Sequence, residues 1–272
     1  MNIYHAWFQI GTVTERTANQ LIYAVMLCTT CTDTNVGESL HVAGLLFILS
    51  APSGSGKSTL VSQLRSMVRD LDFSVSWTTR APRGSEQEGR EYHFTSRKDF
   101  ERMIATDGFL EHADVFGNYY GTARKSLEEA AARGRDLLLD IDVQGAAQVR
   151  RNMPEAITIF ILPPNPEVLA LRLTNRSRAE GGVADAVVEK RLATARQEIE
   201  NYHEYGYVLV NDILERAVEE LTAIVIAERS KGQPDATANP ELQRSLVLAE
   251  RCRLENSRER LQPVLASFGL SM

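Results

Sequence analysis

A glycine-rich segment at residues 51–59, Ala-Pro-Ser-Gly-Ser-Gly-Lys-Ser-Thr, narrows the choice of fold more than any other part of the chain. Residues 45–49 before it form an apolar run of strand length, and residues 57–68 after it have a helical pattern. A turn between a strand and a helix presents backbone N–H groups and the positive end of the helix to a polyphosphate. The segment therefore predicts a phosphate-binding loop in an α/β domain.

Individual residues of this loop have predictable tasks. Gly54 and Gly56 let the backbone approach the phosphates. Lys57 is expected to reach the β and γ phosphates of the bound nucleotide, and the Ser58 hydroxyl to bind Mg²⁺. The usual pattern begins with glycine where this chain has alanine, which the loop tolerates unless that residue needs a positive φ. The residues predicted to bind the nucleotide phosphates are Ala51, Pro52, Ser53, Gly54, Ser55, Gly56, Lys57, Ser58 and Thr59.

A second strand-length run, residues 137–141, is apolar except for Asp140 and is followed by Asp142. Open parallel sheets bind ligands beyond the carboxyl ends of their strands. Asp140 is therefore expected to hold Mg²⁺, partly through water, and Asp142 to face a second ligand. The alternative interpretation is a pair of aspartates that only cap a helix or stabilise a turn.

Further strand-length apolar runs lie at residues 157–162 and 207–210, and helix-compatible segments separate the runs. Strands that alternate with helices and are apolar on both faces predict a doubly wound parallel sheet of the α/β class. The predicted helices are residues 126–133, 166–176, 186–202 and 215–229.

Composition excludes several classes of protein. Hydrophobic residues at 43% and charged residues at 24% exclude collagenous, disordered and membrane-spanning chains. A net charge of -6 indicates no general nucleic-acid surface, so we expect neither nucleic acid nor membrane as a partner. Three cysteines are too few for a disulfide framework and predict a cytoplasmic protein. Cys28 and Cys31 form a single C-x-x-C pair, to which we assign no function because metal sites usually need a second pair.

The two ends of the chain differ from its middle. Residues 1–42 show no sustained period of 2 or 3.6 and are expected to be a poorly ordered extension. Residues 230–239 are polar, contain glycine and proline, and predict a linker. Pro240 then begins a helical pattern that continues to about residue 260, so residues 240–272 are expected to be a helical extension.

Between the two phosphate-site motifs, residues 76–83 read Ser-Trp-Thr-Thr-Arg-Ala-Pro-Arg, and arginine forks suit a phosphate monoester. Further motifs follow in order: Gly-Arg-Glu-Tyr-His-Phe at 89–94, Gly-Phe-Leu-Glu at 108–111, Gly-Asn-Tyr-Tyr-Gly-Thr at 117–122 and Asp-Ile-Asp-Val-Gln-Gly at 140–145. In this combination the chain resembles the guanylate kinase family over about residues 45–229.

The resemblance implies an enzyme that transfers the γ-phosphoryl group of MgATP to GMP, giving ADP and GDP. It also implies a P-loop NTPase fold at residues 43–229, with an inserted GMP-binding subdomain at about 76–124 and a mobile lid at about 172–190. ATP and GMP are the expected substrates, with dGMP as a further acceptor and Mg²⁺ as the cofactor.

The resemblance also assigns the acceptor residues. Glu111 and Thr122 would read the base, because a carboxylate can accept from the N1–H and the 2-amino group of guanine, which adenine lacks. The family often has serine at the position of Thr122, and threonine retains the hydroxyl. Asp140 and Asp142 belong to the predicted GMP site. The GMP phosphate would be held by Ser76, Arg80, Arg83, Tyr92 and Tyr120.

Three arginines of the predicted lid would close over the phosphates, and an exposed charged helix is the alternative. The family commonly has glycine where Asn175 and Ser177 stand. Asn211 is predicted on the adenine side of ATP. The predicted catalytic set is Lys57, Arg80, Arg172, Arg176 and Arg191.

Two other functions stay open at this point. A catalytically inactive guanylate-kinase-like module that binds proteins would have a degraded phosphate loop, whereas Gly54, Gly56 and Lys57 are present. A related P-loop kinase for another phosphorylated small molecule would not need Glu111 or the tyrosine-rich motif at residues 117–122.

Overall fold

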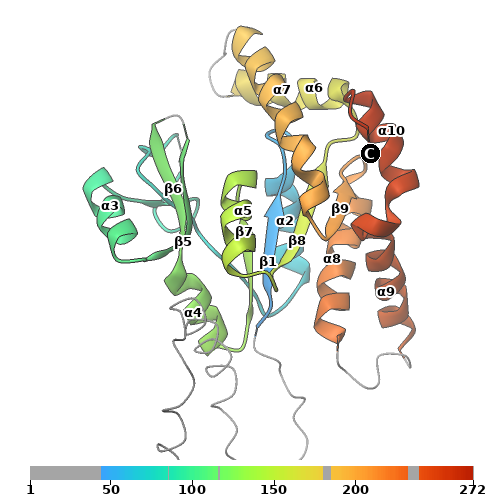
Figure 1. Cartoon of the computed structure of the whole chain (residues 1–272), viewed down its shortest axis with the longest axis horizontal. Helices are drawn as coiled ribbons and strands as arrows, with labels where there is room; N and C mark the ends of the chain where they lie inside the picture. Colours follow the sequence, from blue (N-terminus) through green and yellow to red (C-terminus); the bar gives the residue numbers. More distant parts are fainter. Residues whose placement is uncertain (1–43, 85, 116, 180–184, 232–238, 272) are drawn as a thin grey trace, which may run out of the picture. The chain divides into compact units, whose positions relative to one another are not determined.

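The computed structural model describes residues 44–271 except positions 85, 116, 180–184 and 232–238 (Figure 1). The predicted extension at residues 1–42, the Cys28 and Cys31 pair, and most of the predicted linker lie outside the described residues. In the described ranges, no helix is both long enough and apolar enough to cross a membrane.

A five-stranded sheet in the order β2-β7-β1-β8-β9 forms the centre of the protein, and all of its strand pairs are parallel. The central strand β1 is buried along its whole length, which explains why its sequence is a continuous apolar run. The predicted α/β class with a parallel sheet is therefore confirmed. The strands are β1 (Leu46–Ser50), β2 (Leu71–Phe73), β7 (Asp136–Asp140), β8 (Ile157–Leu162) and β9 (Tyr207–Val210).

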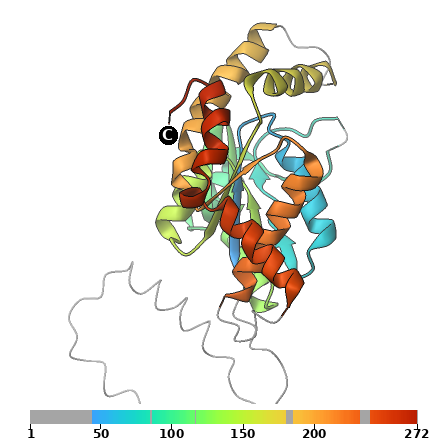
Figure 2. The same ribbon diagram turned by 90° about the vertical axis from the view of Figure 1, so that its right-hand side faces the viewer.

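Helices cover both faces of this sheet (Figures 1 and 2). Successive residues of β1 point to opposite faces, so Ile48 packs in one core cluster and Phe47 and Leu49 in the other. One cluster includes residues of α4, α5, α6, α7 and α10, and the other includes residues of α2, α8 and α9. These helices are α2 (Lys57–Met67), α4 (Arg124–Ala132), α5 (Val143–Asn152), α6 (Pro166–Ala179), α7 (Asp185–Ile199), α8 (Leu214–Ser230), α9 (Pro240–Cys252) and α10 (Arg258–Ser267).

A second, four-stranded sheet in the order β4-β3-β6-β5 is inserted between β2 and β7 in the sequence. Helix α3 (Arg97–Ala105) packs on it through Phe100, whose ring stacks on Phe109 at 4.3 Å and on Tyr119 at 5.3 Å. The interval 76–124 encloses all four strands, which are β3 (Trp77–Thr78), β4 (His93–Phe94), β5 (Phe109–Val115) and β6 (Asn118–Ala123).

The C-terminal part differs from the single helix expected from the sequence. Helix α9 ends at Cys252, and the 3-10 turn η3 (Leu254–Asn256) separates it from α10. The break has a local cause, because the backbone of Arg253 is extended and the Ser257 hydroxyl donates to the carbonyl of Arg253 at 2.6 Å. A second 3-10 turn, η2 (Glu200–Glu204), follows α7.

Candidate active site

The loop between β1 and α2 has the backbone geometry of a phosphate cradle. Gly54 and Gly56 have φ values of 87° and 88°, a region that favours glycine. A β carbon at Gly56 would overlap the side-chain amide of Asn211. Ala51 is absent from the positive-φ residues, which among described non-glycine positions are Asp70 and Asp107 alone, so alanine fits the first loop position without strain.

The amino-terminal end of α2 faces this loop. No side chain caps the helix, and its first turn has no acidic residue, so its backbone N–H groups and positive dipole end suit an anion. The Lys57 ammonium donates to the carbonyl of Ile141 at 3.0 Å and forms an ion pair with Asp140. Because β1 and β7 run parallel, with Leu49 opposite Asp140, the loop and the aspartate meet at one edge of the sheet.

Two predicted residues from later in the chain support the loop backbone. The Asn211 side chain is buried and donates to the Ser55 carbonyl at 2.7 Å. The Arg172 guanidinium donates to the same carbonyl at 3.2 Å and to the Asn211 carbonyl at 3.1 Å, and burial lowers the pKa of Arg172. The structure thus brings both residues to the ATP loop, where they fix its shape. The predicted contact of Asn211 with adenine stays a prediction.

Sequence reasoning did not identify Glu198, near the end of α7. Its carboxylate accepts a hydrogen bond from the Ser53 backbone N–H at 3.3 Å. Burial raises the pKa of Glu198, the charge of Asp142 raises it further, and the charge of Lys57 lowers it. A single glutamate in an amphipathic helix carries no motif, so only the fold shows that it reaches the loop.

The described residues of the predicted phosphate-monoester site converge on Arg80. The Arg80 guanidinium donates to the Tyr120 hydroxyl at 3.1 Å and lies 5.3 Å from the centre of the Tyr92 ring. It also donates to Glu86 at 2.9 Å, and this hydrogen bond holds the pKa of Glu86 below its usual value. Glu86 was not predicted, and its carboxylate takes one donor of the guanidinium, Nη2, while Nη1 donates to the Ala81 carbonyl at 2.8 Å.

Two other predicted phosphate ligands lie beside this cluster with different exposure. The Arg83 side chain is exposed, and its backbone N–H donates to Glu86 at 2.8 Å. Ser76 is half-buried, and its carbonyl accepts from the His93 N–H at 2.9 Å in the β3–β4 region.

Glu111 and Thr122 form a buried pair on adjacent strands. They are register partners in β5 and β6, and the Thr122 hydroxyl donates to the Glu111 carboxylate at 2.6 Å. Glu111 is only 5% exposed. Burial, with a further contribution from the charge of Asp142, raises the pKa of Glu111 to about 7. A β carbon at Gly145 would lie 2.5 Å from the carboxylate, so glycine is required opposite the acid.

Asp142 interacts electrostatically both with Glu111 of the buried pair and with Glu198 beside the phosphate loop. Its carboxylate caps α5 by accepting from the Gln144 and Gly145 N–H groups at 2.9 and 2.8 Å, so the capping role considered from the sequence is present. Its charge also raises the pKa of both Glu111 and Glu198. The neighbouring Asp140 likewise contributes to the raised pKa of Tyr92, which is due mainly to burial. The phosphate loop and the buried acid therefore share the carboxyl end of β7.

Part of the predicted lid can be described. Arg191 is half-buried on α7, seven residues before Glu198, a spacing that puts both on one face of the helix. Arg176 belongs to α6, and its side chain lies outside the described residues, as do residues 180–184.

Comparisons with known proteins agree with this arrangement. The family model described as "Guanylate kinase" matches residues 44–228. The guanylate kinase of Koribacter versatilis (strain Ellin345) is 53% identical over 227 residues, which cover 84% of this chain and 97% of that protein. The guanylate kinase of Neisseria meningitidis serogroup A is 52% identical over 193 residues, or 71% of this chain and 92% of that protein. The crystal structure of guanylate kinase from Anaplasma phagocytophilum superposes with a TM-score of 0.57 at 36% identity, covering 70% of this chain and 88% of that one.

Proposed function

Since the chain belongs to the guanylate kinase family, we propose that the phosphate loop and the Glu111 pair are the donor and acceptor halves of one active site. The chain is an ATP-dependent nucleoside monophosphate kinase that transfers the γ-phosphoryl group of ATP to GMP, giving ADP and GDP. One observation supports the residue assignment most strongly. The buried Glu111–Thr122 pair lies close to Gly145, just beyond the carboxyl end of β7, where the phosphate loop also lies.

In the donor half, the ATP phosphates lie against the N–H groups at the start of α2, and Lys57 moves from Asp140 to the β and γ phosphates. Asn211 and Arg172 keep the Ser55 carbonyl turned away from the anion, because both donate to it. The other loop residues, from Ala51 to Thr59, line the same turn.

In the acceptor half, the GMP phosphate replaces the Glu86 carboxylate on the Arg80 fork. This exchange is chemically matched, because both groups are anionic and Arg80 Nη2, which now donates to one Glu86 oxygen, can donate to a phosphate oxygen instead. Tyr92 and Tyr120 already contact Arg80, and Ser76 and Arg83 are the further ligands of the phosphate.

The guanine base is read by the ionised Glu111. Its carboxylate accepts from the N1–H and the 2-amino group of guanine, while the Thr122 hydroxyl fixes the orientation of the carboxylate. AMP offers neither donor and would leave a buried acceptor unpaired, and sites of this kind discriminate by about 10⁴-fold. No assigned residue depends on the 2′-hydroxyl, so dGMP is a further acceptor.

The site offers hard oxygen donors for a magnesium ion. Among the described residues no group of three or more His, Cys, Asp or Glu side chains forms a protein metal cage. Ser58 and Asp140 fit the alternative, because Mg²⁺ keeps several waters and uses one or two protein oxygens beside the phosphates. When bound, the ion neutralises charge on the transferred group.

Phosphoryl transfer requires no protein nucleophile here. The acceptor phosphate of GMP is itself anionic, so catalysis consists of in-line positioning and charge stabilisation by Lys57, Arg80 and the lid arginines Arg172, Arg176 and Arg191. Water is the competing acceptor, and closure of the lid over residues 172–190 excludes it.

The composition supports a cellular location and a class of binding partner. Three cysteines in 272 residues support a reducing, cytoplasmic location, and the net charge of -6 supports small nucleotides over nucleic acid as partners. The intact phosphate loop argues against a non-catalytic protein-binding module.

The test is acceptor selectivity. ADP formation from MgATP is measured with GMP, dGMP, AMP, UMP and CMP supplied separately at equal concentrations. GMP and dGMP should exceed AMP in kcat/KM by about 10³-fold or more. AMP or CMP turning over as fast as GMP would overturn the assignment of Glu111 and Thr122.

A further inference from the structure

The C-terminal segment that includes helix α10 contacts helix α7, which carries Arg191 and Glu198. Leu261, Leu265 and Phe268 of the C-terminal segment are fully buried in the same core cluster as Ala195 and Ile199 of α7. The matched family region ends at residue 228, so this packing partner lies beyond it. The C-terminal segment therefore adds a contact to α7 that the family model does not describe.

A specific polar contact joins the two helices. The Arg196 guanidinium donates twice to the Phe268 carbonyl, from Nε at 3.2 Å and from Nη2 at 2.7 Å. This carbonyl stands at the negative end of α10, which favours a cation. Gly269 follows with a φ of 75°, and a β carbon there would lie 3.1 Å from Arg196 Nη2, so the chain turns closely around the guanidinium.

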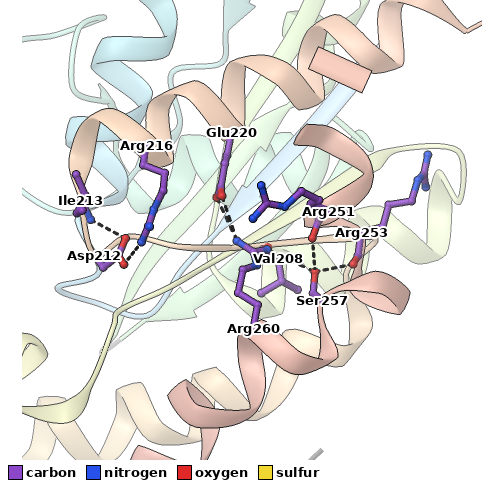
Figure 3. A network of polar contacts seen from close by, with 9 residues as sticks. All are labelled: Val208, Asp212, Ile213, Arg216, Glu220, Arg251, Arg253, Ser257 and Arg260. Atoms are coloured by element: carbon purple, nitrogen blue, oxygen red, sulfur yellow. Dashed lines mark hydrogen bonds and ion pairs between the residues drawn. The ribbon is translucent and has the colours of Figure 1, made fainter. Parts of the chain in front are cut away.

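The C-terminal segment is itself tied to the central sheet. Strand β9 lies at the edge of that sheet, and the Leu254 N–H donates to the Gly206 carbonyl at 3.0 Å. Arg260 of α10 donates to the Val208 carbonyl at 2.6 Å and pairs with the buried Glu220 of α8 at 3.2 Å (Figure 3). The carbonyls of Gly206, directly before β9, and of Val208, within it, are thus bonded to the C-terminal segment. At a free sheet edge such carbonyls would be unpaired.

The Ser257 hydroxyl strengthens this anchor. It donates to the carbonyls of Arg251 and Arg253, at 3.0 and 2.6 Å, and so holds the turn between α9 and α10 (Figure 3). The segment from Arg253 to Phe268 is thus fixed to the core at one end and to α7 at the other.

We propose that Arg196 is a positioning residue for phosphoryl transfer: through the Phe268 carbonyl, α10 braces α7 and sets where α7 presents Arg191 and Glu198. Arg196 lies five residues after Arg191 and two before Glu198, whose carboxylate contacts the phosphate loop at Ser53. The inference rests on the proposed function of Arg191 at the transferred phosphoryl group. Small displacements of a charge-stabilising group reduce the rate strongly, by about 10²-fold for 1 Å.

The test uses four full-length variants in the coupled ADP assay. Arg196→Met keeps the aliphatic packing but removes both donors, Arg191→Met removes the proposed phosphate ligand, and the third variant combines them. Arg258→Met is the matched control, because it removes an exposed guanidinium from the same C-terminal helix.

We expect Arg196→Met to lower kcat about 10-fold and to change the KM for GMP by less than about twofold. Arg191→Met should lower kcat by about 10²-fold or more. The double variant should match Arg191→Met within about twofold, because the first residue acts through the second. Arg258→Met should keep the wild-type kcat.

The possible outcomes distinguish the proposed role of Arg191 in phosphoryl transfer from the proposed positioning role of Arg196. Full activity of Arg191→Met would overturn the proposed function of that arginine. If Arg191→Met is impaired while Arg196→Met keeps the wild-type kcat, or if the two losses multiply in the double variant, the brace is wrong.

A second measurement, on a milder variant, tests the proposal if Arg196→Met folds poorly. Hydrogen exchange of the full chain should show faster exchange in residues 188–199 and 258–268 of Arg196→Lys, with β5 and β6 unchanged, because a lysine cannot repeat the two-donor contact with the Phe268 carbonyl. Unchanged exchange in both segments would also contradict the brace.

Discussion

Replacing Glu111 by glutamine separates the two consequences of burying an acid at the base site. The amide has the shape of the protonated acid and can still accept the Thr122 hydroxyl bond, but it cannot ionise. The substitution should therefore remove base recognition and, at the same time, stabilise the folded protein at high pH.

The stability effect follows from the pKa. Burial raises the pKa of Glu111 from 4.5 to about 7, so the folded state favours the protonated form. Such a group stabilises the fold fully below pH 4.5, and this contribution is lost as the pH rises through 7. The total loss is about 3 kcal/mol, of which about 2 kcal/mol falls between pH 5.5 and 8.5. The difference in free energy of unfolding between Glu111→Gln and the wild type should therefore increase by about 2 kcal/mol, in favour of the variant, from pH 5.5 to pH 8.5.

The activity effect has the opposite sign. The wild-type carboxylate makes two charge-assisted hydrogen bonds to guanine, each contributing about 1.5–3 kcal/mol. The glutamine amide has only one acceptor oxygen, and its NH2 group would face one of the guanine N–H donors. We expect kcat/KM for GMP to fall by about 10²–10⁴-fold.

Urea denaturation at pH 5.5 and 8.5, with the coupled assay at pH 8.5, measures both effects. Thr122→Ser is the matched control, because it keeps the hydroxyl and should retain GMP activity. A Glu111→Gln protein that is less stable than the wild type at pH 8.5, or that still prefers GMP, would refute the reasoning.

Three further outcomes are expected. Lys57→Ala should lower kcat by about 10³-fold or more while calorimetry shows GMP affinity within about twofold of wild type, since the lysine belongs to the donor half; loss of GMP binding in a folded variant would contradict that division. Gly145→Ala should weaken GMP binding by at least about tenfold, because its β carbon meets the Glu111 carboxylate at 2.5 Å, whereas Gly206→Ala, where a β carbon has its nearest neighbour at 3.7 Å, should leave GMP affinity unchanged. The wild-type kcat/KM for GMP should rise with pH through about 7 and level off above it, as Glu111 ionises, and this rise should be absent from Glu111→Gln; the same rise in both proteins would assign the titration elsewhere.

Four strands of the central sheet were predictable because they are buried on both faces, whereas the three-residue edge strand β2 was missed. Runs such as residues 137–139 and 157–162 are almost wholly apolar and separated by helical patterns, so their strand length and their strand-forming residues identify them. The inserted sheet was not predicted as strands. Strands β3 and β4 are two residues long, which is too short to show alternation, and the longer strands β5 and β6 have no regular alternation of buried and exposed residues.

The site was predictable where motifs are long. The loop glycines, Lys57 and the Glu111–Thr122 pair come from ordered motifs, and the structure brings them to one end of β7. Glu86 and Glu198 were missed because each is a lone carboxylate whose partner, Arg80 or Ser53, is chosen by tertiary packing. The break after Cys252 was missed for a similar reason, since the helical spacing of apolar residues continues across it.

The central claim is that ATP and GMP bind on the two sides of β7's end, close enough for direct transfer. It is tested most directly by calorimetry with one molecule in which adenosine and guanosine are joined through five phosphates. The account predicts that one such molecule binds per chain, more tightly than ADP or GMP alone, and displaces both ATP and GMP. Displacement of only one nucleotide, or binding of two molecules per chain, would contradict it.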